Sequence, residues 1–356
     1  MSLSVVTVPA PAPGGTVSPL VAEFAAVQQR HCVETFGNDD LADSADSLGV
    51  AYSEQGTRRK LIAVALEGDV VVGGCFFGLP LKDNRTLAEG DFAVVPGADT
   101  AEVMTTLWEE ARPQLRAAGR RTVQVWMSHR IGSAAQEVTP RTGVGRLPRD
   151  AVAVTLQGLG FELEQVERHS VLEVATSRSS VAAAAVRARE AAGASYETFG
   201  WVGSTPETLR EEMAAIMARM STDVPVGELQ LEPEVWDAAR VAEADRVAER
   251  VGRRRLTTVA RPVGSGQIVA YTQLDVPGDK PQVAYQEDTL VHAGHRGHRL
   301  GLLVKALNLE QLARECPEVE RVHTWNAGEN EHMLAINHAL GFSDHTVEGG
   351  WQLTGL

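Results

Sequence analysis

Apolar and polar residues along this chain follow the same order twice. In the first half, runs rich in apolar residues at 60–66 and 70–79 flank a short polar turn, and in the second half runs at 256–260 and 268–276 flank a loop around Gly264. Short apolar runs bounded by turn residues are typical of β-hairpins. The sequence therefore predicts one hairpin in each half.

Each hairpin is followed by the same series of predicted elements. A strand, a helix and another strand come first, at 87–95, 100–118 and 122–127 in the first half and at 288–292, 300–314 and 321–325 in the second. Both series then reach the tripeptide Leu-Gly-Phe, at 159–161 and 340–342, and end in a last strand, at 162–174 and 346–353. Agreement in element order over this length indicates an internal repeat.

The repeat predicts two units of workable domain size. We expect a leader of strand plus loop at 1–15, a first domain at 16–176, a linker helix at 177–194 and a second domain at 195–356. Within the linker, 177–180 is interpreted as loop and helix cap and 181–186 as a short Ala-rich helix. The fold class is α/β in the mixed (α+β) sense, with a mostly antiparallel mixed sheet flanked by helices in each domain.

The second domain is expected to open with two helices. Thr205-Pro206 is a typical helix start, and the helix that follows, running to about Met220, places Met213 and Met217 on one face. This stripe is either part of the core or an adaptable wall of an acceptor or acyl pocket. A second helix, charged and mostly solvated, is predicted at 233–251.

Composition limits the function classes. The formal net charge of −14 argues against a nucleic-acid surface and favours a cationic or neutral acceptor. No apolar run reaches the roughly 20 residues of a membrane span, and the start of the chain lacks the basic region of a secretory signal. Cys32, Cys75 and Cys316 lack metal-ligand spacing, so we expect reduced thiols in a cytoplasmic protein without bound metal.

A turn rich in glycine and basic residues follows the strand at 288–292. From His295 to Gly301 the chain reads His-Arg-Gly-His-Arg-Leu-Gly, and an amphipathic helix continues from there. Amides at a helix start are unpaired, the helix dipole favours negative charge there, and glycine lets the backbone approach a phosphate. Arg296 and Arg299 would add charge-assisted hydrogen bonds. The pattern is therefore either an anion site or an ordinary basic loop.

The segment resembles motif A of the GCN5-related N-acetyltransferases, the GNAT superfamily, whose pattern is Gln/Arg-x-x-Gly-x-Gly/Ala after the fourth strand. Arg296 takes the first position and Gly301 the last, while Arg299 stands where the middle glycine is usual. The element order of residues 196–356 resembles the family throughout, whereas residues 16–175 resemble only its scaffold. The resemblance implies a tandem two-domain GNAT form whose second domain binds an acyl-CoA.

Three groups of coenzyme A contacts are implied by the resemblance. The backbone of Leu290, Val291 and His292 would pair with the pantetheine arm like an added strand. Asn326 and Asn330 would lie beside the pantetheine and acyl end, although Asn326 also has the capping-box spacing to Glu329. The pyrophosphate would be held by the turn, through the amides of Arg296, Gly297, His298, Arg299, Leu300 and Gly301.

The first copy lacks this chemistry. At the matching place, 94–100, it has one glycine and no arginine, and Asp99 stands where a phosphate would lie. The Asp99 carboxylate would repel a pyrophosphate. The first domain is therefore expected to be a degenerate copy that shapes or covers the site without binding the coenzyme.

Acyl transfer to an amine needs a neutral amine, a thioester held close and a stabilised oxyanion. Glu287 is the leading candidate for the general base, because alternation along its strand puts it on one face with Tyr285 and Thr289. Its alternative role is a solvated carboxylate at a strand end. His292 and His323 are rival proton carriers, although a lone histidine is more often structural.

The leaving group has no obvious acid. The family commonly uses a tyrosine four residues before the glycine of Leu-Gly-Phe, and here that residue is Asn337. An asparagine can donate a hydrogen bond to the departing sulfur but cannot protonate it. Water, or a residue from the other domain, is the alternative proton source, and the coenzyme could also leave as a thiolate stabilised by backbone amides.

The resemblance implies an acyltransferase that uses acetyl-CoA, or another acyl-CoA, to acylate a primary amine of a small molecule by direct attack in a ternary complex. Acetyl is expected because nothing indicates a long-chain tunnel. We expect a monomer or homodimer with no nucleic-acid or membrane partner. Asn337 leaves a second hypothesis open, a non-catalytic acyl-CoA sensor or assembly protein. The acceptor pocket is assigned to the first helices of the second domain and to loops such as 221–225.

Overall fold

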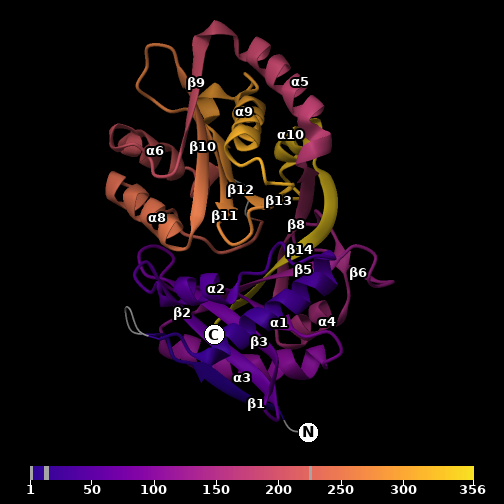
Figure 1. The fold of residues 1–356 in the computed structure, drawn as a ribbon. Coiled ribbons are helices and arrows are strands. Elements are labelled where there is room, and N and C mark those ends of the chain that lie inside the picture. Colours follow the sequence, from indigo (N-terminus) through magenta and orange to yellow (C-terminus); the bar gives the residue numbers. More distant parts are fainter. Residues whose placement is uncertain (1–2, 12–15, 224–226) are drawn as a thin grey trace.

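One twelve-stranded sheet runs through the whole molecule. In the computed structural model, which describes residues 3–11, 16–223 and 227–356, the strand order is β1-β2-β3-β4-β5-β14-β8-β13-β12-β11-β10-β9 (Figure 1). Only β4–β5 and β12–β13 pair in parallel, and the other pairs of this sheet are antiparallel. This confirms the predicted mixed, mostly antiparallel sheet with flanking helices.

The two halves contribute matching sets of elements. The first half contains β1 (Leu3–Val8), α1 (Pro19–Phe36), α2 (Ala45–Ser53), β2 (Arg58–Glu67), β3 (Val70–Pro80), β4 (Leu87–Val94), α3 (Thr100–Ala117), β5 (Thr122–Arg130), β6 (Glu137–Val138), β7 (Leu147–Pro148), α4 (Ala151–Gly158) and β8 (Glu162–Glu173). The second half contains α5 (Val174–Ala192), η1 (Gly193–Ser195), β9 (Tyr196–Val202), η2 (Glu207–Leu209), α6 (Arg210–Met217), α7 (Met220–Asp223), α8 (Ala238–Arg250), β10 (Arg253–Pro262), β11 (Ala270–Pro277), β12 (Val283–Val291), η3 (Ala293–His295), α9 (Leu300–Glu315), β13 (Arg321–Ala327), α10 (Glu331–Leu340) and β14 (Ser343–Thr354).

The halves exchange their last strands. β14, the last strand of the chain, pairs with β5 of the first half, and β8 pairs with β13 of the second half. β8 and β14 also pair with each other at the centre of the sheet. Figure 1 shows β14, in yellow, passing from the upper half into the lower one. The boundaries 16–176 and 195–356 therefore follow the sequence repeat, but the sheet has no break between them.

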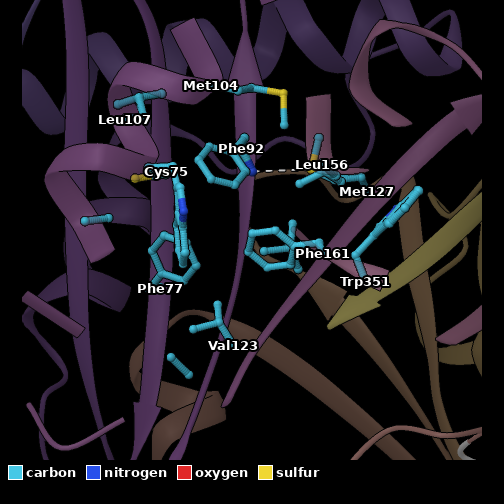
Figure 2. Packing of buried hydrophobic residues seen from close by; sticks show 14 of the residues in the cluster. Cys75, Phe77, Phe92, Met104, Leu107, Val123, Met127, Leu156, Phe161 and Trp351 are labelled. Carbon is cyan, nitrogen blue, oxygen red and sulfur yellow. Dashed lines mark hydrogen bonds between the residues drawn. The ribbon is translucent and has the colours of Figure 1, made fainter. Parts of the chain in front are cut away.

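The exchanged strand helps to build the core of the first half. Trp351 of β14 is fully buried in the same cluster as Phe92, Phe161 and Met127 (Figure 2). Phe161, from the first Leu-Gly-Phe tripeptide, packs edge-on against Trp108 of α3 at 5.0 Å between ring centroids. Burial of large aromatic side chains is a major source of core stability, so the first half depends on the end of the chain.

The linker differs from its prediction. α5 spans Val174–Ala192, so 177–180 lies inside a helix and is not a loop. Its buried face is a stripe of small residues, including Ala184 and Ala188, that packs on the side of α9. The strand β9, Tyr196–Val202, was not predicted. It pairs antiparallel with β10 as the edge of the second half.

The helices that open the second half also differ in length. Met213 and Met217 are buried against Tyr271 and Leu290, which confirms the interpretation of this stripe as core. The second helix, α8, begins at Ala238 behind an Asp237 cap rather than at residue 233. No helix within the described residues is long and apolar enough to cross a membrane.

Candidate functional site

The basic turn lies exposed between β12 and α9. After Val291 the chain passes through η3, and α9 begins at Leu300. Gly297 and Arg299 have left-handed backbones, with φ of 90° and 56°. Such a φ favours glycine. Arg299 therefore adopts a glycine-like conformation at the place where the resembled motif has its middle glycine.

The N-terminus of α9 lacks a side-chain cap, unlike its counterpart in the first half. Arg299 precedes the helix and makes no capping hydrogen bond. In α3 the Asp99 side chain accepts a hydrogen bond from the Glu102 amide at 3.1 Å. Uncapped amides at a helix start can bind an anion, whereas in α3 a carboxylate already occupies the helix start and bonds one of its amides. Of this pair, α9 is the helix whose start carries no side-chain cap.

The side chains of the turn are held by neighbours at the strand end. Arg296 donates Nε–H to the Val291 carbonyl at 3.3 Å and forms an ion pair with Asp223 at 3.3 Å. The Tyr196 hydroxyl and Nδ1 of His295 lie 3.0 Å apart. These contacts fix the course of the turn while more than half of the Arg296 side chain stays exposed.

β12 and β13 part from each other just before the turn. They pair only from Val283 to Tyr285 on β12, opposite Arg321 to His323 on β13. Beyond Tyr285 the edge of β12 that faces β13 pairs with no strand among the described residues. The His292 amide donates to the Val269 carbonyl, on the side of β12 away from β13. Because the amides of consecutive strand residues point to opposite sides, the Val291 amide faces the gap between β12 and β13. An extended chain could add to this edge.

A β-bulge interrupts β12 within the gap. Thr289 pairs with Thr272 and Gln286 pairs with Leu274, so β12 has one extra residue around Glu287 and Asp288. The side-chain alternation predicted from Tyr285 to Thr289 is therefore broken: Thr289 bonds the Thr272 hydroxyl at 2.7 Å, while Tyr285 and Glu287 line a cavity. The matching pair in the first half, β3–β4, has a regular register.

Glu287 lies in a charged wall of the cavity. Its carboxylate is 3.3 Å from the Arg253 guanidinium, and its side chain keeps 37% of its exposure. Burial raises the pKa of Glu287 to about 7, the nearby Asp275 carboxylate adds to this rise, and Arg253 opposes it. A carboxyl group that titrates near neutral pH is suited to accept a proton there.

The asparagines and His292 have local partners. Asn330 caps α10 by accepting from the Met333 amide at 3.2 Å, so the cap predicted for Asn326 belongs to Asn330. Asn337 is buried and donates to Asn326 at 2.5 Å. Nδ1 of His292 accepts from the Gly294 amide at 3.1 Å, which makes His292 the cap of η3. His292 is not among the residues that line the cavity.

His323 belongs to a buried chain that connects the halves. Its Nε2 lies 3.1 Å from Asp40 of the first half, and its Nδ1 lies 2.9 Å from Nε2 of His169 on β8. Asp40 also pairs with Arg321 at 2.5 Å. Burial lowers the pKa of His169 to about 2, with His323 adding to the effect, so His169 is neutral. These contacts give His323 a structural role beside the gap.

The central cavity, of about 380 Å³, lies where both halves meet. Its wall includes Glu287 and Trp325 from the second half, Asp91 and Trp126 from the first, and Glu348 from the exchanged strand β14. Of the predicted site residues, the structure brings Glu287 to this cavity and gathers Arg296 to Gly301 at the start of α9. Val224 and Pro225 of the loop expected to shape the acceptor pocket lie outside the described residues.

The sequence analysis did not predict which residues of the first half line this cavity. Asp91 follows Gly90 inside the largely apolar strand run 87–95. A carboxylate in a buried strand is unusual and could have marked the position. Glu348 and Arg253 carried no such signal, because their approach to the cavity depends on the strand exchange and on the packing of the halves.

The comparisons with known proteins bear on the fold. Neither a family model nor a curated protein sequence matches the chain. A solved tandem GNAT protein from the clavulanic acid biosynthesis pathway is 22% identical, with a TM-score of 0.74 over 100% of this chain and 99% of that one. A GCN5-related N-acetyltransferase from Sphaerobacter thermophilus is 12% identical, with a TM-score of 0.59 over 98% of this chain and 95% of that one.

The sheet order, the parted parallel strands and these likenesses define the class of fold. The chain has the GCN5-related N-acetyltransferase fold, in its tandem form. The likeness to the tandem protein spans the whole chain, so both halves and their exchanged strands take part in it.

Proposed function

We propose that the chain is an acyl-CoA-dependent N-acyltransferase that transfers an acetyl group from acetyl-CoA to a primary amine of a small molecule. The observation that carries this proposal is the uncapped start of α9, which follows a left-handed basic turn and adjoins the gap between β12 and β13. An anion site beside an unpaired strand edge matches a ligand with a pyrophosphate at one end and an amide-containing arm.

The chain's own residues would bind the coenzyme along this path. The amides of Leu300 and Gly301, with the Arg299 side chain, would bind the pyrophosphate. Gly301 lets α9 pack closely here, because an added Cβ would lie 3.2 Å from the Ile336 side chain and 3.4 Å from that of Val291. The Val291 amide would bind the arm, and Asn326 and Asn330 would lie near its far end.

Glu287 would move the proton of the acceptor. When bound, the acyl-CoA supplies the acyl group: the amine nitrogen bonds to the carbonyl carbon, the C–S bond breaks and coenzyme A leaves with a proton. Glu287, half-exposed in the cavity, would accept the amine proton directly or through water. The extra residue of the bulge is unpaired in the β11–β12 ladder, so its amide can donate to the carbonyl oxygen.

Asn337 supports a second function, a non-catalytic acyl-CoA sensor. Asn337 is buried and donates to Asn326, and it cannot act as an acid. In that case the same site would bind acyl-CoA without turnover.

The two functions are separated by one pair of measurements. Acetyl-CoA is incubated with the protein and a panel of primary amines, and free thiol is followed with a thiol reagent. Coenzyme A binding is measured separately by calorimetry. The transferase releases thiol only when an amine is present. Coenzyme A binding without thiol release across the panel would favour the sensor, and an absence of coenzyme A binding would reject both.

A further inference from the structure

Gaps in both halves open onto the central cavity. β4 and β5 pair in parallel only up to Gly90 and Val125, and β12 and β13 only up to Tyr285 and His323. The cavity wall includes residues at or just beyond these points, 91–93 and 126–128 in the first half and 285–287 and Trp325 in the second. The acceptor side of the proposed catalytic site is therefore closed by the first half.

Carboxyl groups dominate the wall. Asp43, Asp91, Glu287 and Glu348 line it, and Arg253 is its only lysine or arginine among the described residues. The Asp91 carboxylate has no hydrogen bond or ion pair within the part of the chain that is described. Glu348 accepts only from the Ser128 hydroxyl, at 3.2 Å. Carboxylates that are partly removed from water normally have cationic or hydrogen-bonding partners, and these two half-buried ones lack a cation among the described residues.

The carboxyl groups form two sets. Burial raises the pKa of Glu348 to about 8, with Glu167 and then Asp91 adding to the rise. Burial and the Asp43 carboxylate raise the pKa of Asp91 to about 7. The charges that act on Glu287 come instead from its own half, chiefly Asp275 and Arg253. The charges that act on Glu348 and Asp91 therefore differ from those that act on Glu287.

The rest of the wall also suits a cation. Gln286 is buried and fixed, since its Nε2 donates to the Thr272 hydroxyl at 3.0 Å and to the Gln273 carbonyl at 2.7 Å, while its Oε1 has no partner. This leaves a hydrogen-bond acceptor unused in a residue of the wall. Trp126 and Trp325 add aromatic rings, which attract ammonium and guanidinium groups.

We propose that the acceptor carries a second cationic group besides the amine that is acylated, and that Asp91 of the first half and Glu348 of the exchanged strand bind this group. Glu287, which lines the same cavity, then faces the reacting amine. The proposal rests on the acyltransferase function above and gives the first half a role in substrate recognition. Its ligand class is a small diamine or an aminoalkyl guanidine.

The test compares probes that differ only in their second group. Binding of 1,4-diaminobutane, 1-amino-4-guanidinobutane, 1-aminobutane and 4-aminobutanoate to the full chain is measured by calorimetry with coenzyme A present. The two dications should bind about tenfold or more tightly than 1-aminobutane, as expected for one further charge-assisted contact, and 4-aminobutanoate should bind weakest. Equal or tighter binding of 1-aminobutane or 4-aminobutanoate would overturn the proposal on the unmodified protein.

Variants locate the second charge. Asp91→Asn and Glu348→Gln should each lower the affinity for 1,4-diaminobutane about tenfold and leave that for 1-aminobutane and coenzyme A unchanged. Asp46→Asn, which removes the same charge from an exposed residue of α2, is the matched control and should change none of them. Unchanged diamine affinity in both cavity variants would also overturn the proposal.

The outcome separates this inference from the transferase function. If thiol release occurs with 1-aminobutane as readily as with the diamine, the transferase stands and the second cationic group is rejected. If coenzyme A does not bind while the diamine does, the transferase is rejected and the cation site remains.

Discussion

Asp99 and Arg299 stand at the same place in the two halves and have opposite effects on the helix that follows. The Asp99 carboxylate caps α3 through the Glu102 amide at 3.1 Å, whereas Arg299, at φ 56°, leaves α9 without a side-chain cap. A carboxylate at a helix start takes the place of an anion, and a cation there attracts one. One residue in each copy thus accounts for the difference in anion binding that we infer between the halves.

Gly301→Glu should abolish coenzyme A binding, because it puts bulk and negative charge among the amides of α9. An added Cβ at this position already meets Ile336 at 3.2 Å. Calorimetry measures the affinity, and Gly158→Glu, at a helical glycine with open space around it, is the control. Because Gly301→Glu could also disturb folding, Arg299→Asn provides a milder change.

Arg299→Asn should lower coenzyme A affinity about tenfold while keeping the fold, because asparagine tolerates a left-handed backbone but carries no charge. Full affinity in both variants would contradict a site at α9. The groove of about 290 Å³ around Pro96 and Gly97 in the first half would then be the next place to test.

Arg299 should also affect stability through its backbone. Arg299→Val should lower the free energy of unfolding by about 1–2 kcal/mol relative to Arg299→Gly, since a β-branched residue is strained at φ 56° and glycine is not. Urea denaturation measures the difference. Equal stability of the two variants would mean that the turn relaxes into another conformation.

Glu287→Gln should lower turnover without changing coenzyme A affinity. Burial raises the pKa of Glu287 to about 7, with Asp275 adding to the rise and Arg253 opposing it, so kcat/KM of the wild type should increase with pH through about 7 as the carboxyl group loses its proton. The variant should lose this limb of the profile. If Glu287→Gln kept the wild-type turnover and the same increase of kcat/KM with pH, Glu287 would be excluded as the base.

Ionisation of the cavity carboxyl groups should cost stability as pH rises, because several of them resist ionisation in the folded state. Burial and Glu167 raise the pKa of Glu348 to about 8. Its contribution is therefore fully present below the ordinary pKa of a glutamate and is lost as pH rises toward 8. Glu348→Gln should reduce the loss of unfolding free energy between pH 5 and pH 8 in urea titrations. An identical loss in the variant would show that Glu348 ionises normally.

Trp351→Ala should destabilise the whole molecule by about 3–5 kcal/mol, as expected for truncation of a buried aromatic side chain. Trp351 comes from the last strand but packs in the core of the first half (Figure 2). Because β14 pairs with β5 and β8, calorimetry should show one unfolding transition at a lower temperature. Thr354→Ala, at the exposed end of β14, is the control. Two separate transitions would mean that the halves unfold independently.

Much of the scaffold could be predicted because its signals are local. The hairpins at 60–79 and 256–276, the helix behind Asp99 and the basic turn before Leu300 depend on short patterns of apolar, capping and turn residues. The linker was harder, since polar Ser177 to Ser180 resemble a loop, whereas in the structure they lie inside α5, where Ser180 bonds the Leu340 carbonyl at the end of α10. The strand β9 was not predicted because it follows a helix, so no hairpin turn in the sequence indicates where it begins.

The sequence by itself determined the repeat, the mixed α/β class and the difference between Asp99 and Arg299. These follow from residues close together in the chain. Only the tertiary structure decided that β14 and β8 change places, that a bulge takes Thr289 off the face that Tyr285 and Glu287 share, and that Asp91 and Glu348 line the same cavity as Glu287. Strand pairing and cavity walls bring together residues that are hundreds of positions apart, and no local pattern encodes which partners meet.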